Sequence, residues 1–184
     1  MNPLIKKHAL NFGIIAAVIS ILYSLMAYLV DNTLFVNKWL ATIMMIVGFV
    51  LYIMAPMRVK RDQGGYITFR DALAAFVVTF IIAGITGVIW NLLLFNVIDP
   101  DLQSTVQEMT IEKSVQMMER FGAPEDAIDQ SIAQMEETNN YSLGNQVKGF
   151  FMMLMFMIIV GLLVAAVVKK NPPLVDEYSS GDSE

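Results

Sequence analysis

The segment from Val147 to Val168 reads VKGFFMMLMFMIIVGLLVAAVV and indicates the fold class of the chain. It is almost entirely apolar, and it has the length of about 20 residues that an α-helix needs to cross the hydrocarbon core of a bilayer. Three further segments share this character, at about Ala9 to Val30, Val36 to Met57 and Ala72 to Ile98. We therefore expect an all-α polytopic membrane protein whose four spans form a helical bundle.

The rest of the chain is divided by these segments. Residues 1–98 hold three spans (about 9–30, 36–57 and 72–98), residues 99–146 form one polar insert, residues 147–170 hold the fourth span, and residues 171–184 form an acidic tail that we expect to be disordered. The chain is 56% hydrophobic and 16% charged, against about 25% charged in an ordinary soluble domain. It has no cysteine, which excludes disulfides and thiolate chemistry.

The basic residues are sorted by location. Eight flank one side of the expected spans: Lys6, Lys7, Arg58, Lys60, Arg61, Arg70, Lys169 and Lys170. Four lie on the other side: Lys38, Lys113, Arg120 and Lys148. Because basic residues resist translocation, we expect both termini to be cytoplasmic and the insert to be extracytoplasmic, in the periplasm if the membrane is a bacterial inner membrane. We also expect the first segment to be retained, because it is longer than a signal-peptide core of about 7–15 residues.

Small residues, joined in the third span by the strongly polar Asn91, form stripes along the spans. They are Gly13, Ala17, Ser20, Ser24, Gly48, Ala83, Gly87, Asn91, Gly161 and Ala165. In lipid, small residues let two helix backbones approach closely, so such stripes indicate helix–helix contacts. The contacts can lie within one subunit or between subunits of a homo-oligomer, and the sequence does not separate the two.

Helix caps are also signalled in the sequence. Thr68 is expected to cap the third span, with Asp71 three residues further on. Asp99 is expected to cap the next helix, with Pro100 at its first position. We hypothesise that Asp99 also pairs with Lys148; the alternative is a capping Asp99 and a snorkelling Lys148.

The insert is expected to be an amphipathic helical hairpin, with one helix from about Pro100 to Phe121 and a second from Pro124. Ten carboxylates lie between Asp99 and Asn140, against two basic residues. One apolar seam is expected to bury itself within the hairpin or against a protein partner. It consists of Val106, Met109, Val115, Met118, Phe121, Ile128, Ile132 and Met135. Contact with lipid headgroups is not expected, because acidic helices are not drawn to anionic lipids.

Two short motifs carry a resemblance. They are GGYITFRDA at Gly64 to Ala72 and FNVIDPD at Phe95 to Asp101. With the insert before the last apolar helix, they make the chain resemble the bacterial membrane proteins grouped as domain-of-unknown-function family 4199, over Leu4 to Lys170. The resemblance implies a bacterial inner-membrane protein with four spans. It implies no activity, cofactor or catalytic residue.

No residue pattern indicates catalysis. The single histidine, His8, is interpreted as an interfacial residue beside Lys6 and Lys7. No nucleophile–base pair, phosphate-binding glycine loop or calcium loop is recognisable, so we expect no enzyme activity, no cofactor, no metal site and no nucleic-acid partner.

We expect a non-enzymatic scaffold or accessory subunit that uses the insert for protein interaction. The alternative is a small oligomeric transporter or channel component. Its polar pathway would be formed by Ser20, Ser24, Thr79, Thr86 and Asn91. The tryptophans Trp39 and Trp90 are expected near the outer membrane interface, as aromatic belt residues.

Overall fold

The described residues, 2–171 of a computed structural model, form helices and no strand. The helices are α1 (Pro3–Val30), η1 (Asn32–Val36, a 3-10 helix), α2 (Lys38–Asp62), α3 (Phe69–Leu93), η2 (Leu94–Ile98, a π-helical turn), α4 (Asp101–Arg120), α5 (Glu125–Glu137) and α6 (Leu143–Val168). The expected disordered tail lies outside the described residues from residue 172 onward.

Four helical segments are long and apolar enough to cross a membrane by length and composition: α1, α2, α3 continued by η2, and α6. They are longer than the apolar segments of the sequence. Helix α6, for example, begins at Leu143 rather than at Val147, because Ser142 caps it by accepting a hydrogen bond from the Asn145 N–H. Backbone hydrogen bonding thus continues through polar residues that a search for apolar windows leaves out.

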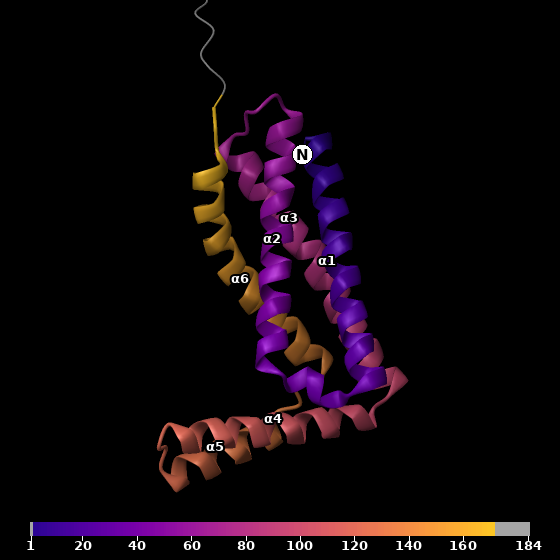
Figure 1. The fold of residues 1–184 in the computed structure, drawn as a ribbon, viewed down its shortest axis with the longest axis vertical. Helices are drawn as coiled ribbons and strands as arrows, with labels where there is room; N and C mark the ends of the chain where they lie inside the picture. Colours follow the sequence, from indigo (N-terminus) through magenta and orange to yellow (C-terminus); the bar gives the residue numbers. More distant parts are fainter. Residues whose placement is uncertain (1, 172–184) are drawn as a thin grey trace, which may run out of the picture.

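Helix α3 lies at the centre of the bundle. It packs against α1, α2 and α6, whereas no Cα atom of α1 lies within 8 Å of one in α6 in the described residues. In Figure 1, α1 and α2 run along the long axis, α3 passes behind them, and α6 lies on the flank away from α1. The packing is close where glycines meet α3: a Cβ built on Gly13 would lie 2.8 Å from the Ile82 Cβ, and one on Gly161 would lie 2.9 Å from the Phe76 Cδ1.

Helices α4 and α5 lie crosswise at the end of the bundle away from the N-terminus (Figure 1). We call this the insert end, and the opposite end, with residue 2 and residue 171, the terminal end. At the terminal end, Gly64 and Gly65 adopt φ values of +77° and +92°, which favour glycine, in the turn between α2 and α3. An isolated bridge then joins Ile67 to Lys170, which ties that turn to the end of α6.

Candidate functional site at the insert end

A buried aromatic and aliphatic cluster attaches α4 to the end of the bundle. Leu94, Phe95, Leu102 and Val106 form its buried core. The Phe95 ring stacks on the Tyr141 ring with the two centroids 4.1 Å apart, and burial raises the pKa of the Tyr141 phenol. The first half of α4 is therefore packed against the end of the bundle.

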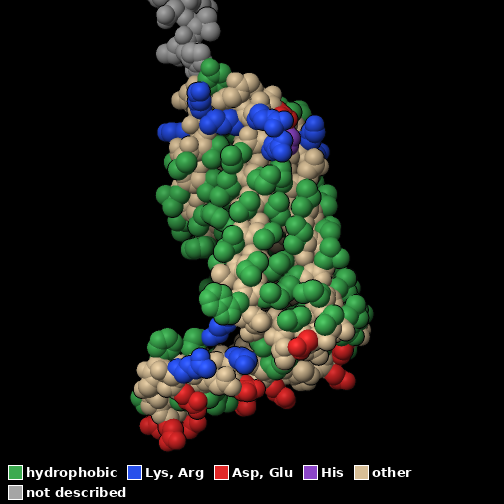
Figure 2. Space-filling view, in the orientation of Figure 1, with side chains coloured by type: hydrophobic (Ala, Val, Ile, Leu, Met, Phe, Trp, Pro, Cys, Tyr) green, Lys and Arg blue, Asp and Glu red, His purple; other side chains and the backbone are tan. Residues whose placement is uncertain are grey.

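Helix α4 separates its charges by face. Asp101, Glu108, Glu112 and Glu119 recur at spacings of seven, four and seven residues, which places them within about 20° of one line along the helix. Lys113 and Arg120 lie about 100° to 120° round the helix from that line, on the same side as Val106. Figure 2 shows the result: carboxylates cover the side of the insert that faces away from the bundle, and basic side chains lie on the side toward it.

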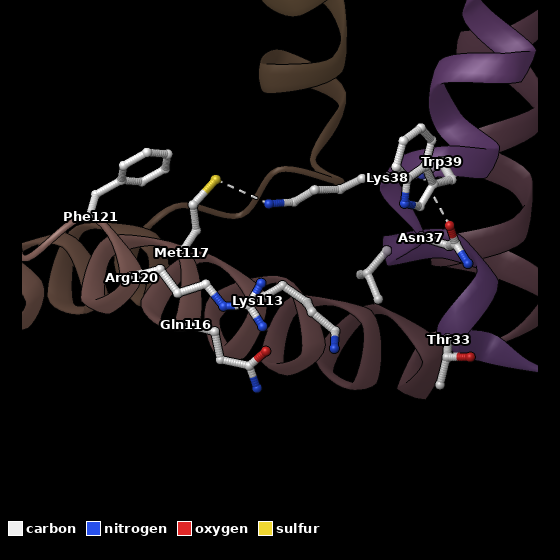
Figure 3. Close-up of a pocket in the computed structure, with 10 residues that line it drawn as sticks. Thr33, Asn37, Lys38, Trp39, Lys113, Gln116, Met117, Arg120 and Phe121 are labelled. Atoms are coloured by element: carbon white, nitrogen blue, oxygen red, sulfur yellow. Dashed lines mark hydrogen bonds between the residues drawn. The ribbon is translucent and has the colours of Figure 1, made fainter.

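A groove lies between the start of α2 and the second half of α4 (Figure 3). Its volume is about 570 Å³. It is lined by Thr33, Val36, Asn37, Lys38, Trp39, Lys113, Gln116, Met117, Arg120 and Phe121. The Lys38 Nζ reaches across it and donates a hydrogen bond to the Met117 Sδ at 3.1 Å. Three cationic side chains and no carboxylate line this groove.

The structure divides the single seam predicted for the insert. Val106 belongs to the buried cluster under the bundle and Met109 packs against that cluster, whereas the Phe121 side chain is 84% exposed. Ile128 of α5 is buried. The others are half-buried: Val115, Met118, Ile132 and Met135. The seam is thus two faces, one toward the bundle and one toward α5, where the Gln107 side chain donates a hydrogen bond to the Met135 carbonyl at 2.9 Å.

The capping residues lie at the ends of α3 and α4. The Thr68 hydroxyl accepts a hydrogen bond from the Asp71 N–H at 3.1 Å. The Asp99 carboxylate accepts one from the Leu102 N–H at 3.0 Å, across Pro100. Asp99 makes no ion pair with Lys148 within residues 2–171. The capping bond replaces the hypothesised ion pair, because it satisfies a helix N–H locally without ordering a long lysine side chain.

Some of the residues predicted for helix packing are buried between helices, and others are not. Ala17, Ser24, Ala83 and Ala165 are buried, as are Gly13 and Gly161; Ser20 is exposed, and Asn91 is half-buried. A Cβ on Gly87 would meet nothing within 4 Å, and one on Gly48 would meet only Tyr52 of its own helix. Gly87 and Gly48 therefore make no close helix contact in this chain. Gly84, which the sequence reasoning missed, makes one: its Cβ would lie 2.6 Å from the Phe150 Cε2.

His8 is not simply an interfacial residue. Its Nε2 lies 2.8 Å from the Asp62 Oδ2, which joins the start of α1 to the end of α2 at the terminal end. The sequence carried one signal for this pair: Asp62 is the single carboxylate among the basic residues from Arg58 to Arg70. No group of three or more His, Asp or Glu side chains in the described part of the chain is placed to hold a metal ion.

The fold and this end of the bundle define the class of the protein. It is an all-helical protein with four helices that suit a membrane and a charged insert at one end of them. Residues 11–170 match the family model described as "Protein of unknown function (DUF4199)", so the chain belongs to that family. No curated protein and no solved structure matches the chain.

Proposed function

We propose that the protein is a non-enzymatic accessory or scaffold subunit of a bacterial inner membrane, and that the acidic face of its insert docks a protein with a basic surface. The observation that carries the proposal is the set of exposed carboxylates on α4 and α5. They are Asp101, Glu108, Glu112, Glu119, Glu125, Asp126, Asp129, Glu136 and Glu137. None of them forms an ion pair within residues 2–171, where His8–Asp62 is the pair present.

The charge pattern favours a protein partner over a bound cation. Calcium and magnesium sites need several oxygens that converge on one point, and the described carboxylates form no such group. They are spread along two helices, where they repel one another and attract an extended surface of opposite charge. A partner with a row of lysines or arginines fits this spread. The chain's single histidine lies at the opposite end, so no imidazole base serves the insert.

The distribution of basic residues supports an orientation. Lys and Arg side chains gather at the terminal end, and carboxylates gather at the insert end (Figure 2). Because basic loops stay in the cytoplasm, the termini lie in the cytoplasm and the insert in the periplasm under this proposal. In whole cells, a membrane-impermeant maleimide is expected to label an E112C variant and to spare an R61C variant until the membrane is permeabilised. The reverse pattern would contradict this orientation.

Three of the five polar residues of the transport alternative, Ser20, Thr79 and Thr86, differ in their exposure and hydrogen bonding. Ser20 is exposed on the outside of α1, whereas Thr79 is fully buried. The hydroxyls of Thr79 and Thr86 donate hydrogen bonds to carbonyls of their own helix, at 2.6 Å and 2.9 Å. A hydroxyl engaged in this way has its proton committed to the backbone of its own helix. These contacts support the scaffold proposal over transport.

A neutralised insert tests the scaffold proposal. In the full-length protein, the substitutions E108Q, E112Q, E119Q, D126N and D129N remove carboxylates from the acidic face and leave the apolar contacts in place. After cross-linking in native membranes, we expect partners with basic periplasmic surfaces to be lost from the purified complex and to return when the carboxylates are restored. The matched control is K113Q with R120Q, which changes the insert's charge on its other face and is expected to keep these partners. An unchanged partner set in the neutralised variant would contradict the proposal.

A further inference from the structure

The groove between α2 and α4 concentrates positive charge that nothing in the described chain neutralises. Lys38, Lys113 and Arg120 line it, and none of the three takes part in an ion pair within residues 2–171. The ammonium of Lys38 donates its hydrogen bond to the thioether sulfur of Met117. A thioether is a weak acceptor for a charged donor. An oxygen-rich anion would provide stronger hydrogen bonds to all three cations.

The rim of this groove is apolar and exposed. Trp39 is 82% exposed and Phe121 is 84% exposed. Along α2, the exposed side chains of Ile43 and Ile46 continue from Trp39 toward the middle of the span. In water, this exposure of aromatic rings beside an acidic helix would be unfavourable. At a bilayer interface, it is the arrangement that lets aromatic side chains and lysine stems contact lipid while the charged groups reach the headgroups.

We propose that this groove binds the phosphate-bearing headgroup of an anionic phospholipid, whose acyl chains lie along the exposed apolar face of α2. Lys38, Lys113 and Arg120 contact the phosphate, and Trp39 and Phe121 flank the glycerol and upper acyl region. The lipid joins the start of α2 to the second half of α4, none of whose side chains belongs to the buried cluster at the insert end. The proposal rests on the chain spanning a membrane and not on a protein partner for the acidic face.

The charge sorting of α4 explains how an acidic insert can lie on lipid. The net charge of the insert is negative, and for this reason the sequence alone predicted no contact with lipid headgroups. In the structure, carboxylates cover the side of the insert away from the bundle (Figure 2). Lys113 and Arg120 lie about 100° to 120° round α4 from its line of carboxylates and line the groove (Figure 3). Each basic residue near a membrane surface favours anionic lipid locally. A soluble phosphate would use the same cations, but it would leave the apolar rim in water.

Quenching of Trp39 fluorescence by brominated lipids measures which lipid lies next to the groove. The chain has two tryptophans, and the second, Trp90, has a buried Nε1 without a hydrogen-bond partner, so W90F removes no bond. The full-length W90F protein is reconstituted into phosphatidylcholine vesicles that contain either dibrominated phosphatidylglycerol or dibrominated phosphatidylcholine. We expect phosphatidylglycerol to be preferred next to Trp39 by at least about fivefold, the effect of one well-placed cation. The added substitutions K38Q, K113Q and R120Q are expected to bring the preference close to one.

Two controls separate this site from other sources of the signal. The set K6Q, K7Q and R70Q removes three exposed charges at the terminal end and is expected to keep the preference at Trp39. Equal quenching by the two lipids in W90F, or a preference that survives the groove substitutions, would overturn the proposal. Loss of the preference on adding millimolar inorganic phosphate, at constant ionic strength, would assign the groove to a soluble anion and would also overturn it.

Discussion

The contact between α1 and α3 at Gly13 makes a quantitative prediction. In G13A the new Cβ would lie 2.8 Å from the Ile82 Cβ and 3.1 Å from the Thr79 carbonyl oxygen. Carbon atoms in ordinary contact lie about 3.5 Å or more apart, so the two helices must separate by roughly 0.7 Å or shift along each other. Neither obstacle is the end of a flexible side chain. Overpacking of this kind costs about 1–3 kcal/mol.

The matched control is G87A on α3, where a Cβ meets nothing within 4 Å. Both substitutions gain about 1 kcal/mol from the higher helix propensity of alanine. The difference between the two variants therefore isolates the packing cost, because the propensity gain cancels. We expect G87A to be neutral or stabilised, and G13A to be less stable than G87A by about 1–3 kcal/mol.

Equilibrium unfolding of the purified protein in mixed detergent micelles measures this difference, with a thermal midpoint as a second readout. Equal stabilities of G13A and G87A would refute the close approach of α1 to α3. A stabilised G13A together with a destabilised G87A would instead mean that Gly87 is the position in contact, in this chain or between subunits.

Three further predictions concern single contacts. T68A removes the N-cap of α3 and is expected to lower the free energy of unfolding by about 1 kcal/mol. T68S keeps a hydroxyl and should retain most of this stability. An unchanged free energy of unfolding in T68A would contradict the cap. A double-mutant cycle of H8Q and D62N, whose side chains are joined at 2.8 Å, is expected to show a favourable coupling in equilibrium unfolding that weakens at high salt. Strictly additive effects would exclude the pair. F95A removes a ring that is 2% exposed and should lower the free energy of unfolding by about 3–5 kcal/mol, with faster proteolysis of the insert. Y141A, which removes the ring stacked on Phe95, should also speed this proteolysis. Unchanged proteolysis in both variants would contradict the packing of the insert against the bundle.

The sequence supported the helices and their caps because those features are local. Four apolar lengths predicted four membrane-suited helices, and Thr68 and Asp99 accept hydrogen bonds from N–H groups three residues away. Gly122 follows the end of α4 with a φ of +73°, the left-handed conformation in which glycine commonly ends a helix. Each of these depends on a few neighbouring residues, which the sequence shows directly.

The contacts between distant segments could not be predicted in the same way. His8 and Asp62 are separated by 54 residues, and Gly84 is close-packed only because Phe150 of α6 crosses it. Helical periodicity gives the angular positions of apolar residues, but it does not say which neighbour each sector meets. For this reason, one predicted seam in the insert became two faces.

The insert's total charge was also a poor guide to its surroundings. A sum over residues ignores direction, whereas a helix places residues 100° apart around its axis. Lys113 and Arg120 are outnumbered in the insert, but they lie together on the side of α4 that meets the groove. The local charge there is positive although the whole insert is acidic.

Under the lipid proposal, α4 lies on the membrane surface with its basic and aromatic side toward lipid and its carboxylates toward water. Because the chain has no cysteine, spin labels can be placed singly with M117C, F121C, E112C and E119C in the full-length protein in lipid nanodiscs. Power-saturation electron paramagnetic resonance then compares collisions with oxygen, which is enriched in lipid, and with a water-soluble nickel complex. We predict that the labels at 117 and 121 favour oxygen and that those at 112 and 119 favour nickel. Equal, water-like accessibility at all four positions would contradict this placement of α4.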